Sequence, residues 1–490
     1  MTPALLVLFA AALLSPVEDP AAKARRAAEL VVAGKADEAI PIYKDLVLSF
    51  PGDPGILLNL SIAEFKAKRY SDAAAHASAV LKLQPDSLAA NLFLGSSYEE
   101  LGEHALALDP LQKVLARQPR ERNARLMLAE ALLNLQRYQE ADAEFQNLRE
   151  LAPENPRVWY GLGRVYEALS EKMMQELETS SPDSSYRHAL TADFLLKQRR
   201  YGSAFTHYRL ALEGHVNLPG AHVGLATVYE RTGHSSWAET ERQRERQAAP
   251  DCHNRTPACD FAAQRFRDIT QAAGSSTAPE ALYWGHKAYA EMAKDAYERL
   301  LQLPPGLEAH MYQAKTFDQR GLSGEAAAEW REALKLAPRD VRIETSLAWS
   351  LFRAHDFAAA LPVVQELLQT QHDSSELNFL FGAILLNLDE PGKAIPPLEA
   401  SLRIHDDFLP AHVALGRALL QTAKPKLAIP HFQAALETDE DASAHFGLLR
   451  AYELSSETSL AAKSKAEYLR ALAAVDAKQK LEEGGAITAP

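Results

Sequence analysis

Apolar and polar positions alternate along the chain at the spacing of amphipathic helices. Residues 88–98 carry apolar side chains in an i, i+3, i+4, i+7 stripe, and residues 107–115 carry a second stripe. Gly102 lies between them, and glycine adopts the left-handed conformation that a helix C-terminus needs. Pro119 stops the second helix, because proline lacks the amide donor of a helix interior. The pattern predicts two helices joined by a tight turn.

This two-helix unit recurs with a period of 34 residues. Prolines keep this spacing early in the chain, at Pro51, Pro85, Pro119 and Pro153. Alanines keep it along most of the chain, at Ala39, Ala73, Ala107, Ala141, then Ala204 and Ala238, then Ala326, Ala360, Ala394 and Ala428. A single hairpin cannot bury its apolar face alone, so a fixed period predicts stacked hairpins and an all-α fold.

The repeat resembles the tetratricopeptide repeat (TPR) superfamily. The family favours Leu-Gly, Tyr, Ala and Pro at fixed positions, and residues 88–121 offer Leu94, Gly95, Tyr98, Ala107 and Pro119. The resemblance implies a right-handed superhelical solenoid of roughly twelve helix-turn-helix hairpins. It also implies a non-catalytic scaffold or adaptor that binds a peptide or a helical segment of another protein on its concave surface.

Two places depart from the period. The repeat that begins at Pro156 reaches Pro182 about five residues early. Its first helix is therefore expected to run on with little turn before the second. After Pro250, residues 258–273 read as one amphipathic helix, and helical patterning resumes over residues 281–301.

These patterns predict five segments. They are a signal peptide or apolar segment (1–17), a first TPR block (20–250), an irregular connection with a cysteine pair (251–280), a second TPR block (281–458), and a capping helix with a disordered tail (459–490).

Composition and motifs narrow the function. A formal net charge of −13 argues against nucleic acid or an anionic membrane as partner. The sequence has no His-Glu-x-x-His motif, no glycine-rich phosphate loop and no Gly-x-Ser-x-Gly elbow. We therefore expect a protein or peptide partner, no catalytic residues, no metal and no small-molecule cofactor. The oligomeric state is left open.

The N-terminus indicates export. Residues 4–14 form an uninterrupted apolar run, too short for a membrane span of about 20 residues but of signal-peptide length. An exported bacterial protein, periplasmic or secreted, is expected. An uncleaved anchor, or a buried first helix in a cytoplasmic adaptor, is the alternative.

The two cysteines, Cys252 and Cys259, are candidates for a disulfide. On a helix their Cα atoms would lie about 10 Å apart, beyond the bridging limit of about 7 Å. Asp251, Asn254 and Pro257 instead predict a loop, in which the two thiols meet. Unlinked thiols are the alternative.

Histidines invite a metal or catalytic interpretation, but their register argues for packing. Five occupy position 4 of a repeat, the bulky slot between helices: His188, His222, His310, His412 and His445. One structural position shared by five histidines favours packing over metal binding.

The second block offers the strongest candidate binding surface. Aromatic and basic residues are the usual anchors of binding patches. Helix positions expected to face the groove are occupied by Tyr312, Lys315, Arg342, Trp349, Phe352, Arg353 and Phe379. They could instead cover one another. Two further functions stay open: an accessory subunit of a glycosyltransferase or of a secretion or assembly complex, and a cytosolic adaptor.

Overall fold

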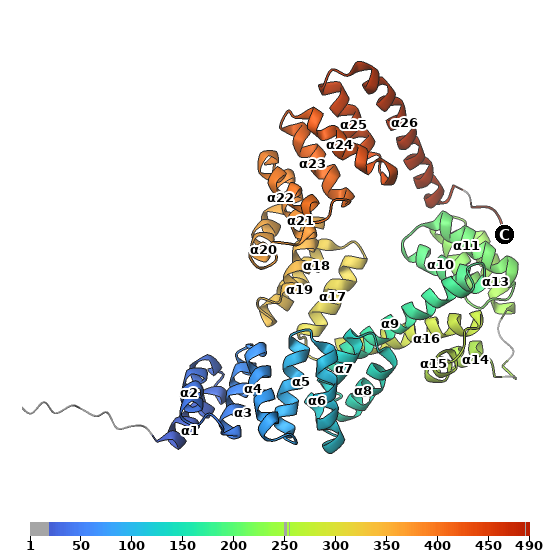
Figure 1. Cartoon of the computed structure of the whole chain (residues 1–490). Coiled ribbons are helices and arrows are strands. Elements are labelled where there is room, and N and C mark those ends of the chain that lie inside the picture. Colours follow the sequence, from blue (N-terminus) through green and yellow to red (C-terminus); the bar gives the residue numbers. More distant parts are fainter. Residues whose placement is uncertain (1–18, 249–251, 254, 486) are drawn as a thin grey trace, which may run out of the picture. The chain divides into compact units, whose positions relative to one another are not determined.

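The computed structural model describes residues 19–248, 252–253, 255–485 and 487–490 (Figure 1). Within these ranges the chain forms α-helices and short helical turns, without a β-strand. The all-α fold predicted from the 34-residue period is therefore confirmed. The expected signal peptide at residues 1–17 lies outside the described part. Among the described helices, none combines the length and the apolar character that a membrane crossing requires.

The chain divides into two compact units, Met1–Val165 and Tyr166–Pro490, with the boundary inside helix α9 (Pro156–Ser180). Unit 1 consists of four hairpins. Their helices are α1 (Pro20–Val32), α2 (Ala36–Ser49), α3 (Pro54–Lys66), α4 (Tyr70–Leu83), α5 (Leu88–Glu100), α6 (His104–Arg117), α7 (Arg122–Asn134) and α8 (Tyr138–Leu151).

Unit 2 holds seven further hairpins. Their helices are α10 (Ser185–Lys197), α11 (Tyr201–Gly214), α12 (Ala221–Arg231), α13 (Ser235–Gln247), α17 (Leu307–Gln319), α18 (Ser323–Leu336), α19 (Val341–Arg353), α20 (Phe357–Thr370), α21 (Ser375–Asn387), α22 (Pro391–Ile404), α23 (Leu409–Gln421), α24 (Pro425–Ala435), α25 (Ser443–Leu454) and α26 (Thr458–Lys480). Two short helices, α14 (Pro257–Ala262) and α15 (Phe266–Ala273), and the long helix α16 (Pro279–Leu301) lie between the second and third of these hairpins.

The repeated alanines are where the two helices of each hairpin meet. All ten alanines of the 34-residue series are fully buried, at 0% exposure. Glycines at position 8 of the first helix serve the same close approach. A Cβ added at Gly95 would lie 2.6 Å from the Leu111 side chain, and one at Gly416 would lie 2.7 Å from Phe432. Small residues at these positions let large residues of the partner helix fill the space.

The turn inside each hairpin uses one residue in the left-handed conformation. Gly34 and Gly102 have φ of 75° and 77°, and Lys68 and Gln136, 34 residues after each of them, have φ of 59°. The left-handed conformation predicted for Gly102 is confirmed. The turn geometry is therefore kept even where the residue is not glycine, at a conformational cost of about 1–2 kcal/mol.

The first helices of successive hairpins contact one another directly. Helix α1 contacts α3, α3 contacts α5 and α5 contacts α7 in unit 1, and in unit 2 α19 contacts α21, α21 contacts α23 and α23 contacts α25. Since each second helix also packs on its own hairpin and the next, the first helices line a common inner face. Residues on that face are available to a ligand running across several repeats.

The irregular regions differ in part from the sequence-based expectation. The repeat at Pro156 forms one continuous helix of 25 residues, α9, with no turn at all. Residues 258–273, expected to form one helix, form α14 and α15 instead, because Gln264 adopts a left-handed φ of 56° and breaks the helix. The aromatic side chains are nevertheless in contact across the break, with Phe261 and Phe266 ring centroids 5.3 Å apart.

The C-terminal region contains the expected capping helix, α26. A disordered tail was predicted after it. In the structure, residues 481–485 form a single π-helical turn, η2 (Leu481–Gly485), which contacts α11.

Candidate protein-binding surface

Three of the predicted surface residues form one aromatic cluster on the first helices of unit 2. Trp349 and Phe352 lie three residues apart on α19 and therefore share a helix face. Phe379 comes from α21, the next first helix. The Trp349 ring centroid lies 6.0 Å from Phe352 and 6.3 Å from Phe379. The 34-residue stacking thus brings together side chains that are distant in sequence.

Two further phenylalanines lengthen this cluster at its ends. Phe357, the first residue of α20, packs edge-on against Phe352 at 5.6 Å, and Phe408, which precedes α23, packs against Phe379 at 5.2 Å. We call the five rings, Phe357, Phe352, Trp349, Phe379 and Phe408, the aromatic ladder. Counting positions within first helices missed both end residues, because each lies at a helix start rather than on the counted face.

The ladder is neither fully buried nor free of the core. Trp349, Phe352 and Phe379 are all half-buried, and each packs on its inner side against the apolar core of the hairpins. Both interpretations drawn from the sequence therefore hold in part: the rings cover one another, and they also present apolar surface to solvent. A half-buried aromatic row is pre-ordered, so a partner that covers it loses little side-chain entropy.

The basic members of the predicted surface are engaged with acidic neighbours. Arg353 Nη2 lies 2.9 Å from Asp318 Oδ1, and Asp318 also accepts hydrogen bonds from Ser350 Oγ at 2.8 Å and from Trp330 Nε1 at 3.2 Å. Arg342 Nη2 lies 3.0 Å from Asp340 Oδ2. These exposed guanidinium groups flank the ladder rather than joining it.

Tyr312 and Lys315, on α17, lie apart from the ladder. The Tyr312 ring stacks on Tyr297 of α16, with centroids 4.0 Å apart, and Lys315 Nζ lies 3.0 Å from Glu167 Oε2 of α9. The seven predicted residues therefore separate into an aromatic core of three and a set of four with partners of their own.

The position-4 histidines take part in a recurring pair inside the hairpins. Four of them contact the residue 19 positions later, on the second helix: His188 with His207, His222 with Glu241, His310 with Glu329 and His412 with His431. His445 instead contacts Asp439, with Nδ1 2.6 Å from Oδ2. The packing role expected from their register agrees with these contacts.

Charge state differs between the two kinds of pair. The hydrogen bond to Glu241 raises the pKa of His222, which also has its Nε2 3.0 Å from the Val216 carbonyl oxygen. Burial, followed by the charge of the facing histidine, lowers the pKa of His207 and of His431. The first kind of pair favours an imidazolium ion, and the second favours neutral rings.

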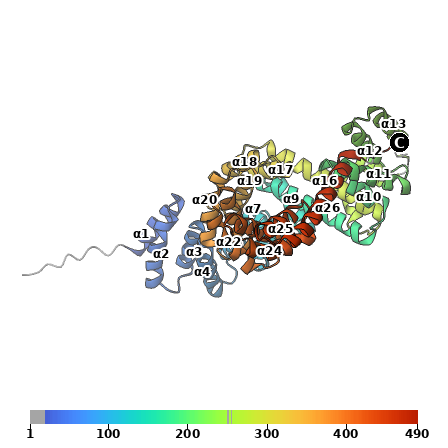
Figure 2. The ribbon, with the colours of Figure 1, turned by 90° about the horizontal axis from the view of Figure 1, so that it is seen from above.

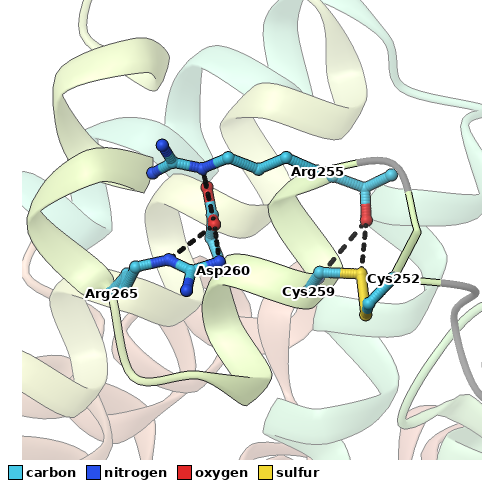
Figure 3. Close-up of a disulfide and its surroundings, with 6 residues drawn as sticks. Cys252, Arg255, Cys259, Asp260 and Arg265 are labelled. Atoms are coloured by element: carbon cyan, nitrogen blue, oxygen red, sulfur yellow. Dashed lines mark hydrogen bonds and ion pairs between the residues drawn. A yellow bond between two sulfur atoms is a disulfide. The ribbon is translucent and has the colours of Figure 1, made fainter.

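The cysteine pair lies beside a cluster of charged side chains (Figure 3). Cys252 and Cys259 are joined by a disulfide, with 5.7 Å between their Cα atoms. Asp260 follows Cys259, and it accepts hydrogen bonds from Arg255 Nε at 2.9 Å and from Arg265 Nη2 at 2.5 Å. The disulfide and the two arginines fix the start of α14. They stabilise the irregular connection and do not resemble a catalytic arrangement.

Within the described ranges, no group of three or more histidine, cysteine or carboxylate side chains has the arrangement of a metal site. The features that the structure assembles are apolar surface, paired charges and extended helix faces. Such features suit the binding of another macromolecule.

Comparison with known proteins identifies the repeats. Residues 30–94 and 98–165 match one tetratricopeptide repeat model, and residues 413–477 match another. No curated protein matches the chain. Among solved structures, MamA (41-end) from Desulfovibrio magneticus RS-1 is 23% identical, with 30% of this chain and 84% of that protein covered and a TM-score of 0.29. A tetratricopeptide repeat protein from Parabacteroides merdae ATCC 43184 is 12% identical, with 68% and 98% covered and a TM-score of 0.34.

The matched segments lie in both units and cover hairpins whose alanine and glycine positions pack as described above. Repeats of this family generally mediate contacts between proteins. The chain therefore belongs to the tetratricopeptide repeat superfamily.

Proposed function

We propose that this protein is a non-catalytic scaffold that binds a segment of another protein across the aromatic ladder. The observation that carries the proposal is the continuous row of half-buried rings from Phe357 to Phe408, on the inner face of adjacent hairpins. Aromatic side chains dominate the energetics of protein interfaces, and hot spots are enriched in tryptophan and tyrosine.

The surroundings indicate the chemistry of the partner segment. The ladder supplies apolar contact, and the side chains around it, Arg353, His355 and Glu376, are exposed and polar. A partner helix or extended peptide with apolar residues on one side and polar residues on the other fits this arrangement. Because the rings are fixed by mutual packing, the surface is formed before the partner arrives.

Location in the cell envelope is part of the proposal. The apolar run at residues 4–14 and the disulfide between Cys252 and Cys259 are both typical of exported proteins. Cell fractionation together with the mass of the mature N-terminus tests this part. A cytosolic protein that keeps residues 1–17 would contradict export without affecting the aromatic ladder.

The binding proposal is tested by affinity purification from the cell envelope with a Trp349→Ala/Phe352→Ala/Phe379→Ala variant. A matched control replaces another aromatic pair of unit 2, Phe446 and Tyr468, whose ring centroids lie 5.4 Å apart outside the ladder. Removing a hot-spot aromatic costs about 2 kcal/mol or more in binding.

We expect the ladder variant to lose a partner that both the wild type and the Phe446→Ala/Tyr468→Ala control retain. Circular dichroism establishes that both variants keep their helices. An identical set of partners for all three proteins would reject the ladder as the binding surface.

A further inference from the structure

The last ten residues of the chain lie against helices α11 and α12 within unit 2. The π-helical turn η2 contacts α11, and the C-terminal end lies near α11, α12 and α13 in both views (Figures 1 and 2). These contacts join positions about 280 residues apart, as in the pair Arg200 and Glu482. They are independent of the aromatic ladder, which uses other hairpins.

A carboxylate holds the start of this segment. Arg200 Nε and Nη2 donate to Glu482 Oε1 at 3.0 and 2.5 Å, and Ser203 Oγ donates to the same oxygen at 2.9 Å. Burial alone would raise the pKa of Glu482, but the hydrogen bonds from Arg200 and Ser203 outweigh burial and lower it. Three donors around one oxygen form a specific seat for a carboxylate, and the guanidinium makes it charge-assisted.

The helix surface next to this seat has no room for a side chain. Gly202 is the second residue of α11, and a Cβ added there would overlap the carbonyl oxygen of Leu481. Gly324 and Gly392 are the second residues of α18 and α22, and a Cβ added at either meets nothing within 4 Å. The backbone of the C-terminal segment therefore lies directly on the helix backbone at Gly202.

The far end of the segment is also held. Tyr229, a fully buried residue of α12, donates its hydroxyl hydrogen to the Thr488 carbonyl oxygen at 2.9 Å. Pro490 lines a cavity of about 430 Å³ whose walls include Arg209 of α11 and Arg244 of α13. The segment thus follows α11 from its first turn toward its last, with polar contacts at both ends.

We propose that α11 and α12 form a binding site for an acidic, extended peptide, and that the chain fills this site with its own residues 481–490. The site selects a carboxylate at Arg200 and Ser203, a backbone that can approach Gly202, and a carbonyl oxygen at Tyr229. Because the ligand is tethered, it acts at a high effective concentration and excludes a similar peptide supplied in solution. The C-terminal segment is therefore an intramolecular latch that closes unit 2.

The test measures binding of a fluorescent peptide of residues 481–490 to full-length proteins by anisotropy. Glu482→Arg opposes a cation to Arg200 and releases the latch while leaving the site intact. We expect this variant to bind the peptide at least about tenfold more tightly than the wild type, because the tethered competitor is gone. Adding Gly202→Ala to Glu482→Arg blocks the site and abolishes binding, whereas adding the matched Gly392→Ala leaves binding unchanged.

Two results would overturn the proposal. One is equal peptide binding by the wild type and Glu482→Arg, or no binding by either. The other is equal binding with and without Gly202→Ala. Light scattering checks whether the segment binds within its own chain: a wild-type dimer that dissociates in Glu482→Arg would mean exchange between two copies and contradict the intramolecular latch. Circular dichroism of each variant confirms that the helices are intact.

Discussion

The stacking of hairpins predicts opposite effects for two glycine-to-alanine substitutions in the same hairpin. Gly382 lies on α21 at the crossing with α22, where an added Cβ would be 2.5 Å from Leu398 Cγ and 3.2 Å from the Ala394 carbonyl oxygen. Gly392 lies on α22, and an added Cβ there meets nothing within 4 Å. Gly382→Ala forces the two helices apart, and Gly392→Ala does not.

The expected magnitude follows from comparing the two variants. Replacing glycine by alanine within a helix favours folding by up to about 1 kcal/mol. Inserting a methyl group into a packed contact costs about 1–3 kcal/mol. Since both variants gain helix propensity, the difference in their free energies of opening approximates the steric cost. Gly382→Ala should therefore be less stable than Gly392→Ala by about 1–3 kcal/mol.

Hydrogen exchange followed by mass spectrometry is the suitable assay. Repeat arrays open locally, so a single global unfolding midpoint would average over many hairpins. Peptides from α21 and α22 should exchange faster in Gly382→Ala and at the wild-type rate, or slower, in Gly392→Ala. Equal protection of this hairpin in both variants would refute the argument that position-8 glycines permit the close helix approach.

Three further predictions concern the turns, the histidines and the disulfide. Gln136→Gly should stabilise unit 1 by about 0.5–1 kcal/mol in urea unfolding, because Gln136 is exposed and holds a left-handed φ of 59° that glycine adopts without strain. An unchanged midpoint would contradict this reasoning. The raised pKa of His222 means that its pair with Glu241 stabilises the fold fully below about pH 6.5, the usual unfolded value, and less as pH rises through the folded value. The stability difference between wild type and His222→Gln should therefore shrink toward alkaline pH, and a difference that grows would reverse the assigned sign. Alkylation of the denatured, unreduced protein should label neither Cys252 nor Cys259, and labelling of both would show that the disulfide is not formed.

The repeated features of the fold were predictable because each is set by local sequence. The alanines at 34-residue spacing, such as Ala107 and Ala360, are all at 0% exposure, as expected for positions where two helices meet. Gly102 has the left-handed conformation expected of a helix end. The position-4 histidines pack within hairpins, although their specific partners 19 residues later were not foreseen.

Features that depend on distant parts of the chain were not predictable from sequence. Residues 258–273 have an unbroken amphipathic pattern, and nothing local shows that Gln264 adopts a left-handed φ. The contact between Arg200 and Glu482 depends on where the solenoid brings its C-terminus, which no periodicity encodes. In the candidate surface, helix counting found Trp349 and its two helical neighbours in the ladder. It did not show that the basic residues pair with acidic side chains.

The most direct test of the scaffold function is site-specific photo-crosslinking at the aromatic ladder in cells. A photoreactive phenylalanine analogue is placed at Phe352, at Phe379 and, as a control outside the ladder, at Phe446, which is 49% exposed on α25. The account predicts that positions 352 and 379 crosslink to the same partner protein and that position 446 does not. Crosslinking of no protein at 352 and 379, or of the same proteins at all three positions, would contradict binding across the ladder.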